Sequence, residues 1–100
     1  MTVVALVTDL MDQSRIRAAL PGVTFARDPE QADGADAVIV DLGRFAERVA
    51  EVRARTTGRV VAFGSHVDDT ALAAARAAGA DAVMARSRFF ADPAAALTGK

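Results

Sequence analysis

The sequence contains no cysteine, no tryptophan and no tyrosine, and these absences exclude several kinds of site. Without cysteine there are no disulfides and no thiolate metal ligands, which is compatible with a reducing cytoplasm. Phenylalanine is the only aromatic residue, so there are few rings on which nucleic-acid bases could stack. Neither a cysteine-based metal centre nor a base-stacking surface is therefore expected.

Charge and hydropathy exclude further classes of partner. The formal net charge is −1, which gives no general attraction to nucleic acid or to an acidic membrane. No apolar run approaches the roughly 20 residues that span a bilayer, and MTVVALVTDL lacks the basic start of a signal peptide. We expect one cytoplasmic domain over residues 1–100, and the excess of arginine and alanine suggests a bacterial source.

What the chain does contain is an alternation of short apolar runs with longer amphipathic ones. The apolar runs predict strands at 2–7, 23–26, 37–42, 59–64 and 80–85. Helices are predicted at 12–20, 44–55, 68–79 and 92–97, with one helical turn after Pro29. This alternation predicts an α/β fold, namely a flavodoxin-like, doubly wound five-stranded parallel sheet of order 2-1-3-4-5 with helices on both faces.

The helix predicted at 44–55 carries two kinds of spacing. Glu51 and Arg55 lie four positions apart, which predicts an ion pair on the outer side of the helix. Gly58, just beyond the last turn, predicts a left-handed cap. The inner side is an apolar stripe made of Phe45, Val49 and Val52.

Polar side chains follow four of the five predicted strands. Asp9 and Asp12 come after the first strand, Asp41 ends the third, Ser65 follows the fourth, and Arg86 follows the fifth. In an open parallel sheet, ligands bind beyond the carboxyl ends of the strands, near the switch between strands 1 and 3. Three carboxylates, a hydroxyl and a guanidinium at one edge suit a divalent cation such as Mg²⁺ and a phosphoryl group.

Two stretches resemble the receiver domains of two-component response regulators. VVAFGSHVDDTALAAARAAGADAVMARSRF, residues 60–89, follows the receiver layout from the fourth strand to the fifth without a gap. ADAVIVDL, residues 35–42, looks like the strand that bears the phosphoacceptor. The resemblance implies that Asp41 is a candidate phosphoacceptor and that Ser65 and Arg86 are candidate phosphoryl contacts. It also implies a candidate Mg²⁺ site made of Asp9, Asp12 and Asp41.

The sequence also departs from the receiver pattern. Active receivers carry two adjacent acids after the first strand, whereas Asp9 and Asp12 are separated by two residues. The hydroxyl expected at the end of the fourth strand falls on Gly64, and the expected lysine is Arg86, whose planar guanidinium does not reproduce a lysine's point contact. The loop after Asp41 is reduced to LGR. These departures predict a shortened, degenerate receiver, or pseudo-receiver.

Each candidate also has a structural interpretation. Asp9 and Asp12 are good N-caps for the first helix, and Asp41 can cap the helix that follows it. Arg86 can pair with a neighbouring carboxylate. Such a pair would substitute for a metal ion and lock the domain in one state.

Phe89 and Phe90 follow the fifth strand side by side, next to Arg88. Adjacent residues point in different directions, so one ring is expected in the core and the other on the surface that receivers use for partners and dimers. Together with Arg88, an exposed ring would make a candidate interface. The alternative is that both rings are buried at the end of the sheet.

Three functions remain open at this point. The first is a non-catalytic regulatory domain that acts through a protein partner or a homodimer. The second is a working receiver in which Asp41 is phosphorylated in a Mg²⁺-dependent way. The third is a domain that binds a small ligand or nucleotide at the same edge of the sheet.

Overall fold

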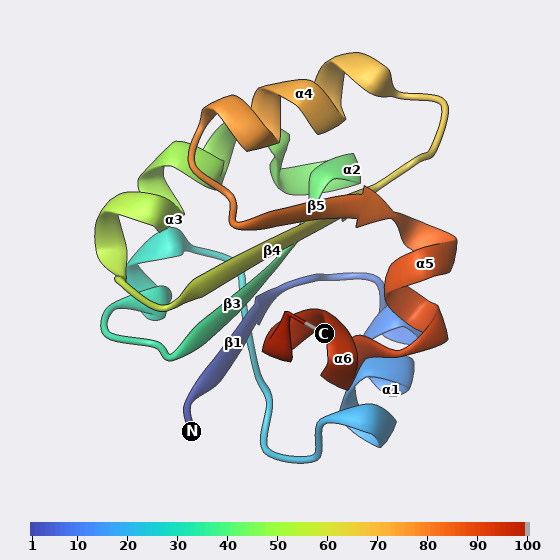
Figure 1. Ribbon diagram of the computed structural model, residues 1–100. Helices are drawn as coiled ribbons and strands as arrows, with labels where there is room; N and C mark the ends of the chain where they lie inside the picture. The colour runs from blue at the N-terminus through green and yellow to red at the C-terminus, as the bar shows by residue number, and fades with distance from the viewer. Residues whose placement is uncertain (100) are drawn as a thin grey trace.

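A five-stranded parallel sheet forms the centre of the computed structural model, which describes residues 1–99 (Figure 1). The strand order is β2-β1-β3-β4-β5, and this confirms the predicted α/β fold class and order. The strands are β1 (Val3–Leu6), β2 (Thr24–Ala26), β3 (Ala37–Asp41), β4 (Arg59–Gly64) and β5 (Ala82–Ala85).

Helices cover both faces of this sheet, as Figure 1 shows. The helices packed on one face are α1 (Leu10–Ala19), α5 (Arg86–Ala91) and α6 (Pro93–Thr98). The elements on the other face are the 3₁₀ turn η1 (Pro29–Ala32), α2 (Leu42–Phe45), the 3₁₀ turn η2 (Ala46–Arg48), α3 (Val49–Arg55) and α4 (Asp69–Ala77). None of the helices formed by residues 1–99 has the length and apolar character needed to cross a membrane.

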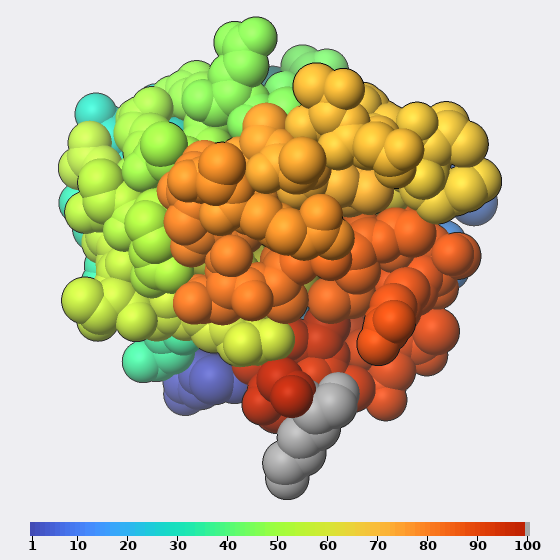
Figure 2. All heavy atoms as spheres, turned by 45° about the horizontal axis from the view of Figure 1, so that its top comes forward, coloured from blue at the N-terminus to red at the C-terminus, as the bar shows by residue number. Residues whose placement is uncertain are grey.

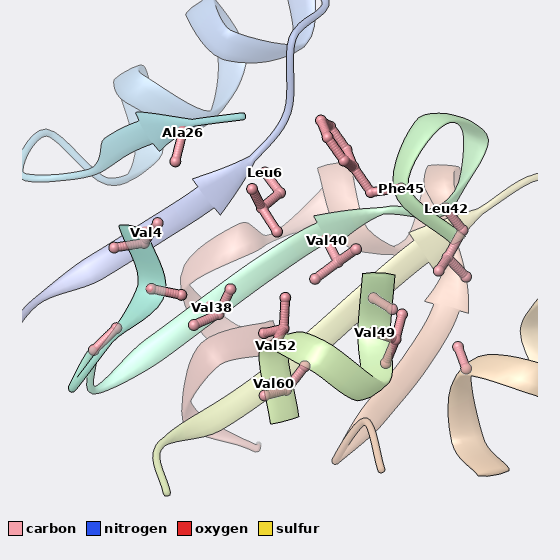
Figure 3. Close-up of a cluster of buried hydrophobic side chains, with 14 residues drawn as sticks. Val4, Leu6, Ala26, Val38, Val40, Leu42, Phe45, Val49, Val52 and Val60 are labelled. Atoms are coloured by element: carbon pink, nitrogen blue, oxygen red, sulfur yellow. The ribbon is translucent and has the colours of Figure 1, made fainter. Parts of the chain in front are cut away.

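The core lies in two layers, one on each face of the sheet. Figure 3 shows the layer that joins β1, β3 and β4 to α2 and α3, in which Val38, Val40 and Val49 are fully buried. The opposite layer holds a stacked pair of rings, Phe63 and Phe89, with centroids 4.7 Å apart. Every residue of β1 and β3 is buried, as continuous apolar runs in a doubly covered parallel sheet require.

The segment predicted as one helix over 44–55 is divided into α2, η2 and α3. The backbone leaves helical geometry at Phe45, whose φ and ψ are −119° and 24°. The apolar stripe is nevertheless buried as predicted. The Glu51–Arg55 pair is wrong, because Glu51 pairs instead with Arg48 at 3.1 Å and Arg55 reaches Asp33 at 3.3 Å.

Gly58 is not a left-handed cap, because its φ is not positive. It is needed because two backbone segments meet there. A Cβ at Gly58 would lie 2.3 Å from the carbonyl oxygen of Asp36 and 2.4 Å from that of Ala35. The predicted left-handed cap is therefore wrong, and glycine is needed at this position because of the close approach of the backbone.

Candidate functional site

A hollow of about 600 Å³ opens at the carboxyl ends of β1, β3 and β4. Among the side chains that line it are Asp9, Asp12, Asp41, Ser65 and Arg86. The structure therefore brings all five predicted site residues to one place. It also adds Gly43 and Arg44 from α2, which the sequence did not single out.

Asp41 is the last residue of β3 and the N-cap of α2. Its Oδ1 accepts a hydrogen bond from the Gly43 N–H at 2.9 Å, so the predicted capping role is present. Burial raises the pKa of the Asp41 carboxyl, and the Gly43 N–H and the charge of Arg86 oppose that change without cancelling it. Asp41 Oδ2 accepts no side-chain or cap hydrogen bond within residues 1–99, which leaves that oxygen available for chemistry.

The two acids of the first loop have different roles. Asp9 is exposed and caps α1, with its Oδ1 accepting from the Asp12 N–H at 2.9 Å. Asp12 does not cap the helix. Its side chain is buried, with 4% of the residue exposed, and it is held by Arg86.

Arg86 begins α5 directly after β5, with no loop between the two elements. Its Nη2 donates to Asp12 Oδ1 at 2.8 Å, and this bond raises the pKa of Arg86. The guanidinium carbon also lies 5.4 Å from the centroid of the Phe63 ring and 5.3 Å from that of Phe90. A hydrogen bond to a buried carboxylate and two aromatic faces fix the position of this cation.

Packing explains why the fourth strand ends in glycine instead of a hydroxyl residue. A Cβ at Gly64 would lie 3.2 Å from the Leu42 Cβ, a contact tight enough to require Leu42 to move. Ser65, the next residue, carries a hydroxyl and is exposed, with its Oγ accepting from the Val67 N–H at 3.4 Å. The short loop after Asp41 thus places Leu42 where it restricts residue 64.

The carboxylates of the hollow do not form a ready metal cluster. Asp12 is engaged with Arg86, and within residues 1–99 no group of three or more His, Cys, Asp or Glu side chains is placed to hold a metal ion. Mg²⁺ binding by Asp9, Asp12 and Asp41 stays a prediction, with Asp9 and Asp41 as the two acids outside the ion pair.

The predicted interface residues fall in three different environments. Phe89 is fully buried against Phe63, so it is the ring of the pair that lies in the core. Phe90 is half-buried, and the Arg15 guanidinium lies 4.2 Å from its ring centroid. Arg88 is exposed. An interface role for Phe90 and Arg88 stays a prediction.

Sequence reasoning missed the network at the opposite, amino end of the sheet. The pentapeptide Gly-Ala-Asp-Ala-Val occurs twice, at 34–38 and 79–83, just where β3 and β5 begin. In each copy the aspartate accepts a backbone N–H from outside its own strand: Asp36 from Thr2 and Asp81 from Val60, both at 2.7 Å. The repeat itself was the signal that could have revealed this role.

Comparison with known proteins supports the fold. No protein-family model matches the sequence, and no curated protein does. Among solved structures, this chain is similar to a response regulator protein from Burkholderia pseudomallei, crystallised with a phosphorylated aspartic acid, a calcium ion and citrate. The TM-score is 0.76 at 16% identity, and the match covers 96% of this chain and 65% of that one. The similarity establishes a receiver-like fold, as the sequence resemblance predicted.

Proposed function

We propose that this chain is a non-catalytic regulatory domain of bacterial signal transduction, a degenerate receiver that acts in the cytoplasm through contacts with other proteins. The ion pair between Arg86 and Asp12 is the observation that carries the proposal. The receiver resemblance implies a metal ion beside the acids of this hollow. Here Arg86 already compensates the charge of the buried Asp12, so this acid needs no metal ion.

One further feature supports an inactive site. The position of the fourth-strand hydroxyl is taken by Gly64, and Leu42 restricts the space for a larger residue. Phosphoryl chemistry at Asp41 would therefore lack one of the partners that the receiver resemblance implies.

A working phosphoacceptor is the second candidate, and one observation favours it. Asp41 lines the hollow, and its Oδ2 makes no bond with the neighbouring side chains of residues 1–99. In this case an Asp41 oxygen would bond to the phosphorus of the donor as the donor's P–O bond breaks, which releases acetate when the donor is acetyl phosphate. Asp9 and Asp41 would hold Mg²⁺, which would supply positive charge beside the phosphoryl oxygens. Ser65 and Arg86 would contact those oxygens.

Intact mass spectrometry separates the two candidates. The chain is incubated with Mg²⁺ and a small phosphodonor such as acetyl phosphate, in parallel with Asp41→Asn. We expect no mass gain in the wild type. A gain of one phosphoryl group that disappears in Asp41→Asn would overturn the proposal. Arg86→Lys is the informative variant, because a gain seen only there would show that the arginine pair is what closes the site.

Light scattering tests the other part of the proposal, namely contacts between proteins. A monomer at micromolar concentration would direct the search to a different partner protein. A dimer that dissociates on Arg88→Glu, with Arg27→Glu as the matched control at the far edge of the sheet, would favour self-association.

A further inference from the structure

The strand β5 lies at the edge of the sheet, and its outer side is open. All four of its residues are only partly buried, in contrast to β1 and β3. A hollow of about 750 Å³ runs along Ala82–Ala85, larger than the hollow around Asp41. In Figure 2 the orange atoms of α4 and β5 adjoin the red atoms of the C-terminal helices on this face.

The backbone of this edge has a defined hydrogen-bonding side. The Asp81 N–H donates to the Val60 carbonyl, toward β4. Because successive residues of a strand direct their N–H and C=O groups to alternate sides, Ala82 and Met84 direct theirs away from β4. Two donors and two acceptors are thus presented to a further strand.

Three arginines surround this edge, and all lie outside β5. Arg76 belongs to α4 on one face of the sheet, Arg88 belongs to α5 on the other, and Arg59 begins β4. None of the three takes part in an ion pair within residues 1–99. Among residues 1–99, the one acidic residue that lines the hollow is Asp92, and its carboxylate caps α6 by accepting from the Ala95 N–H.

We propose that β5 binds an extended acidic segment of a partner protein by strand addition. The segment pairs its backbone with Ala82 and Met84. Since side chains of an added strand alternate between the two faces, its acids meet Arg76 on one face and Arg88 on the other. This inference deepens the proposed function, because it rests on a domain that acts through protein contacts and names the chemistry of the partner.

Charge decides between this partner and a second copy of the chain. A two-fold dimer formed edge to edge would bring each patch against its own copy, so Arg59, Arg76 and Arg88 would face the same three cations. Like charges placed in this way repel. The strand β5 itself contains neither a charged residue nor proline, so none of its own side chains blocks the pairing of a further strand.

Fluorescence anisotropy with a labelled peptide tests the proposal. The probe is an eight-residue peptide, Glu-Glu-Val-Val repeated twice, which places two acids on each face of an extended strand. Its controls are the same peptide with lysine in place of glutamate, and two versions N-methylated at odd or at even positions. We expect binding of the acidic peptide, none of the lysine peptide, and loss with one of the two N-methylated versions.

Protein variants locate the site. Arg76→Glu with Arg88→Glu, both exposed, should weaken peptide binding by about tenfold or more, because each change replaces attraction by repulsion. Arg27→Glu, also exposed but beyond β2, should change it by less than about twofold. Equal binding of both N-methylated peptides, equal loss in Arg27→Glu, or no binding of the acidic peptide would each overturn strand addition at β5.

The outcome is separable from that of the proposed function. Peptide binding by a chain that also gains a phosphoryl group at Asp41 would retain the β5 site and overturn the non-catalytic proposal. Failure of peptide binding without a mass gain would overturn the β5 site alone. If the chain forms a dimer that does not bind the acidic peptide, and if this dimer dissociates in the Arg76→Glu, Arg88→Glu double variant, the partner of β5 is a second copy of the chain and not an acidic segment.

Discussion

An arginine–aspartate ion pair lies at each end of the sheet, and the two pairs differ in what surrounds them. At the amino end, Arg53 donates to Asp81 at 2.9 Å and also to three backbone carbonyls, those of Thr56, Gly58 and Gly79. At the carboxyl end, Arg86 donates to Asp12 alone. The Arg53 guanidinium connects several loops, whereas the Arg86 guanidinium lies in an open hollow.

An arginine–aspartate pair therefore has a structural role at the amino end of the sheet, whereas at the carboxyl end the same kind of pair lies beside an open hollow. The amino end is closed by direct bonds, including those that Asp36 and Asp81 make with backbone N–H groups. The carboxyl end keeps a hollow beside Asp41. Stability of the fold should therefore depend mainly on the amino end, and three predictions test this.

The largest difference in unfolding free energy is expected between two glycine variants, one at each end of the sheet. Gly58→Ala at the amino end should lower the free energy of unfolding by about 3 kcal/mol, or prevent folding, because its Cβ would overlap two backbone oxygens. Gly43→Ala at the carboxyl end should stay within about 1 kcal/mol of the wild type, since only the Asp41 side chain is close and alanine favours the helix.

Urea unfolding of the two glycine variants measures this comparison. Gly22→Ala is the control, because nothing lies within 4 Å of a Cβ at that position. If Gly43→Ala proved as costly as Gly58→Ala, the carboxyl end would be as tightly packed as the amino end.

The next effect concerns the arginines. Arg53→Met should lower the free energy of unfolding by about 2 kcal/mol, because four acceptor oxygens lose a donor. Arg86→Met should cost less, about 1 kcal/mol, because it removes one hydrogen bond instead of four. Chemical denaturation of both variants checks the order, and an equal or reversed order would contradict the comparison.

The smallest effects concern the acids, and they have opposite signs. The hydrogen bond from the Val60 N–H lowers the pKa of Asp81, so Asp81 stabilises the fold above the ordinary carboxyl pKa and less as the pH falls through the lowered value. Asp81→Asn should cost about 1 kcal/mol at pH 7, and its difference from the wild type should shrink in acid.

Burial raises the pKa of Asp41, so ionisation of this carboxyl opposes folding at neutral pH. Asp41→Asn keeps an acceptor for Gly43 and removes the charge, and we expect a Tm at pH 7 a few degrees above the wild type. This gain should disappear as the pH falls from the raised pKa toward the ordinary value of 3.8. Thermal unfolding at a series of pH values measures the Tm of the Asp81→Asn and Asp41→Asn variants against the wild type. A higher Tm of Asp41→Asn that persisted in acid would show that its source is packing and not the lost charge.

The order of the sheet was predictable because each strand is a separate apolar run and parallel connections have one hand. Positions at the carboxyl end were predictable for the same reason, since the ends of parallel strands meet. The identity of the partner of Arg86 was not predictable. Three acids compete for it, and the choice of Asp12 depends on how far α1 and α5 turn those side chains, which spacing does not reveal.

The division of the helix predicted at 44–55 could not be predicted from the sequence pattern. The stripe of Phe45, Val49 and Val52 fits a continuous helix equally well, so the departure from helical geometry at Phe45 could not be predicted from it. Likewise, Phe89 and Phe90 were expected to differ in exposure. The short helix α5 buries Phe89 and leaves Phe90 half-buried, where Arg15 of α1 lies over its ring.

The strand order has a consequence for synthesis on the ribosome. The first 41 residues supply three adjacent strands, β2, β1 and β3, and β4 and β5 then add outward in the order in which they are made. The bond between Arg86 and Asp12 joins residues 74 positions apart, so it forms only after β5 and the start of α5 have been made. Until then Asp12 lacks this partner, and the strand that completes the sheet also brings the arginine that pairs with it.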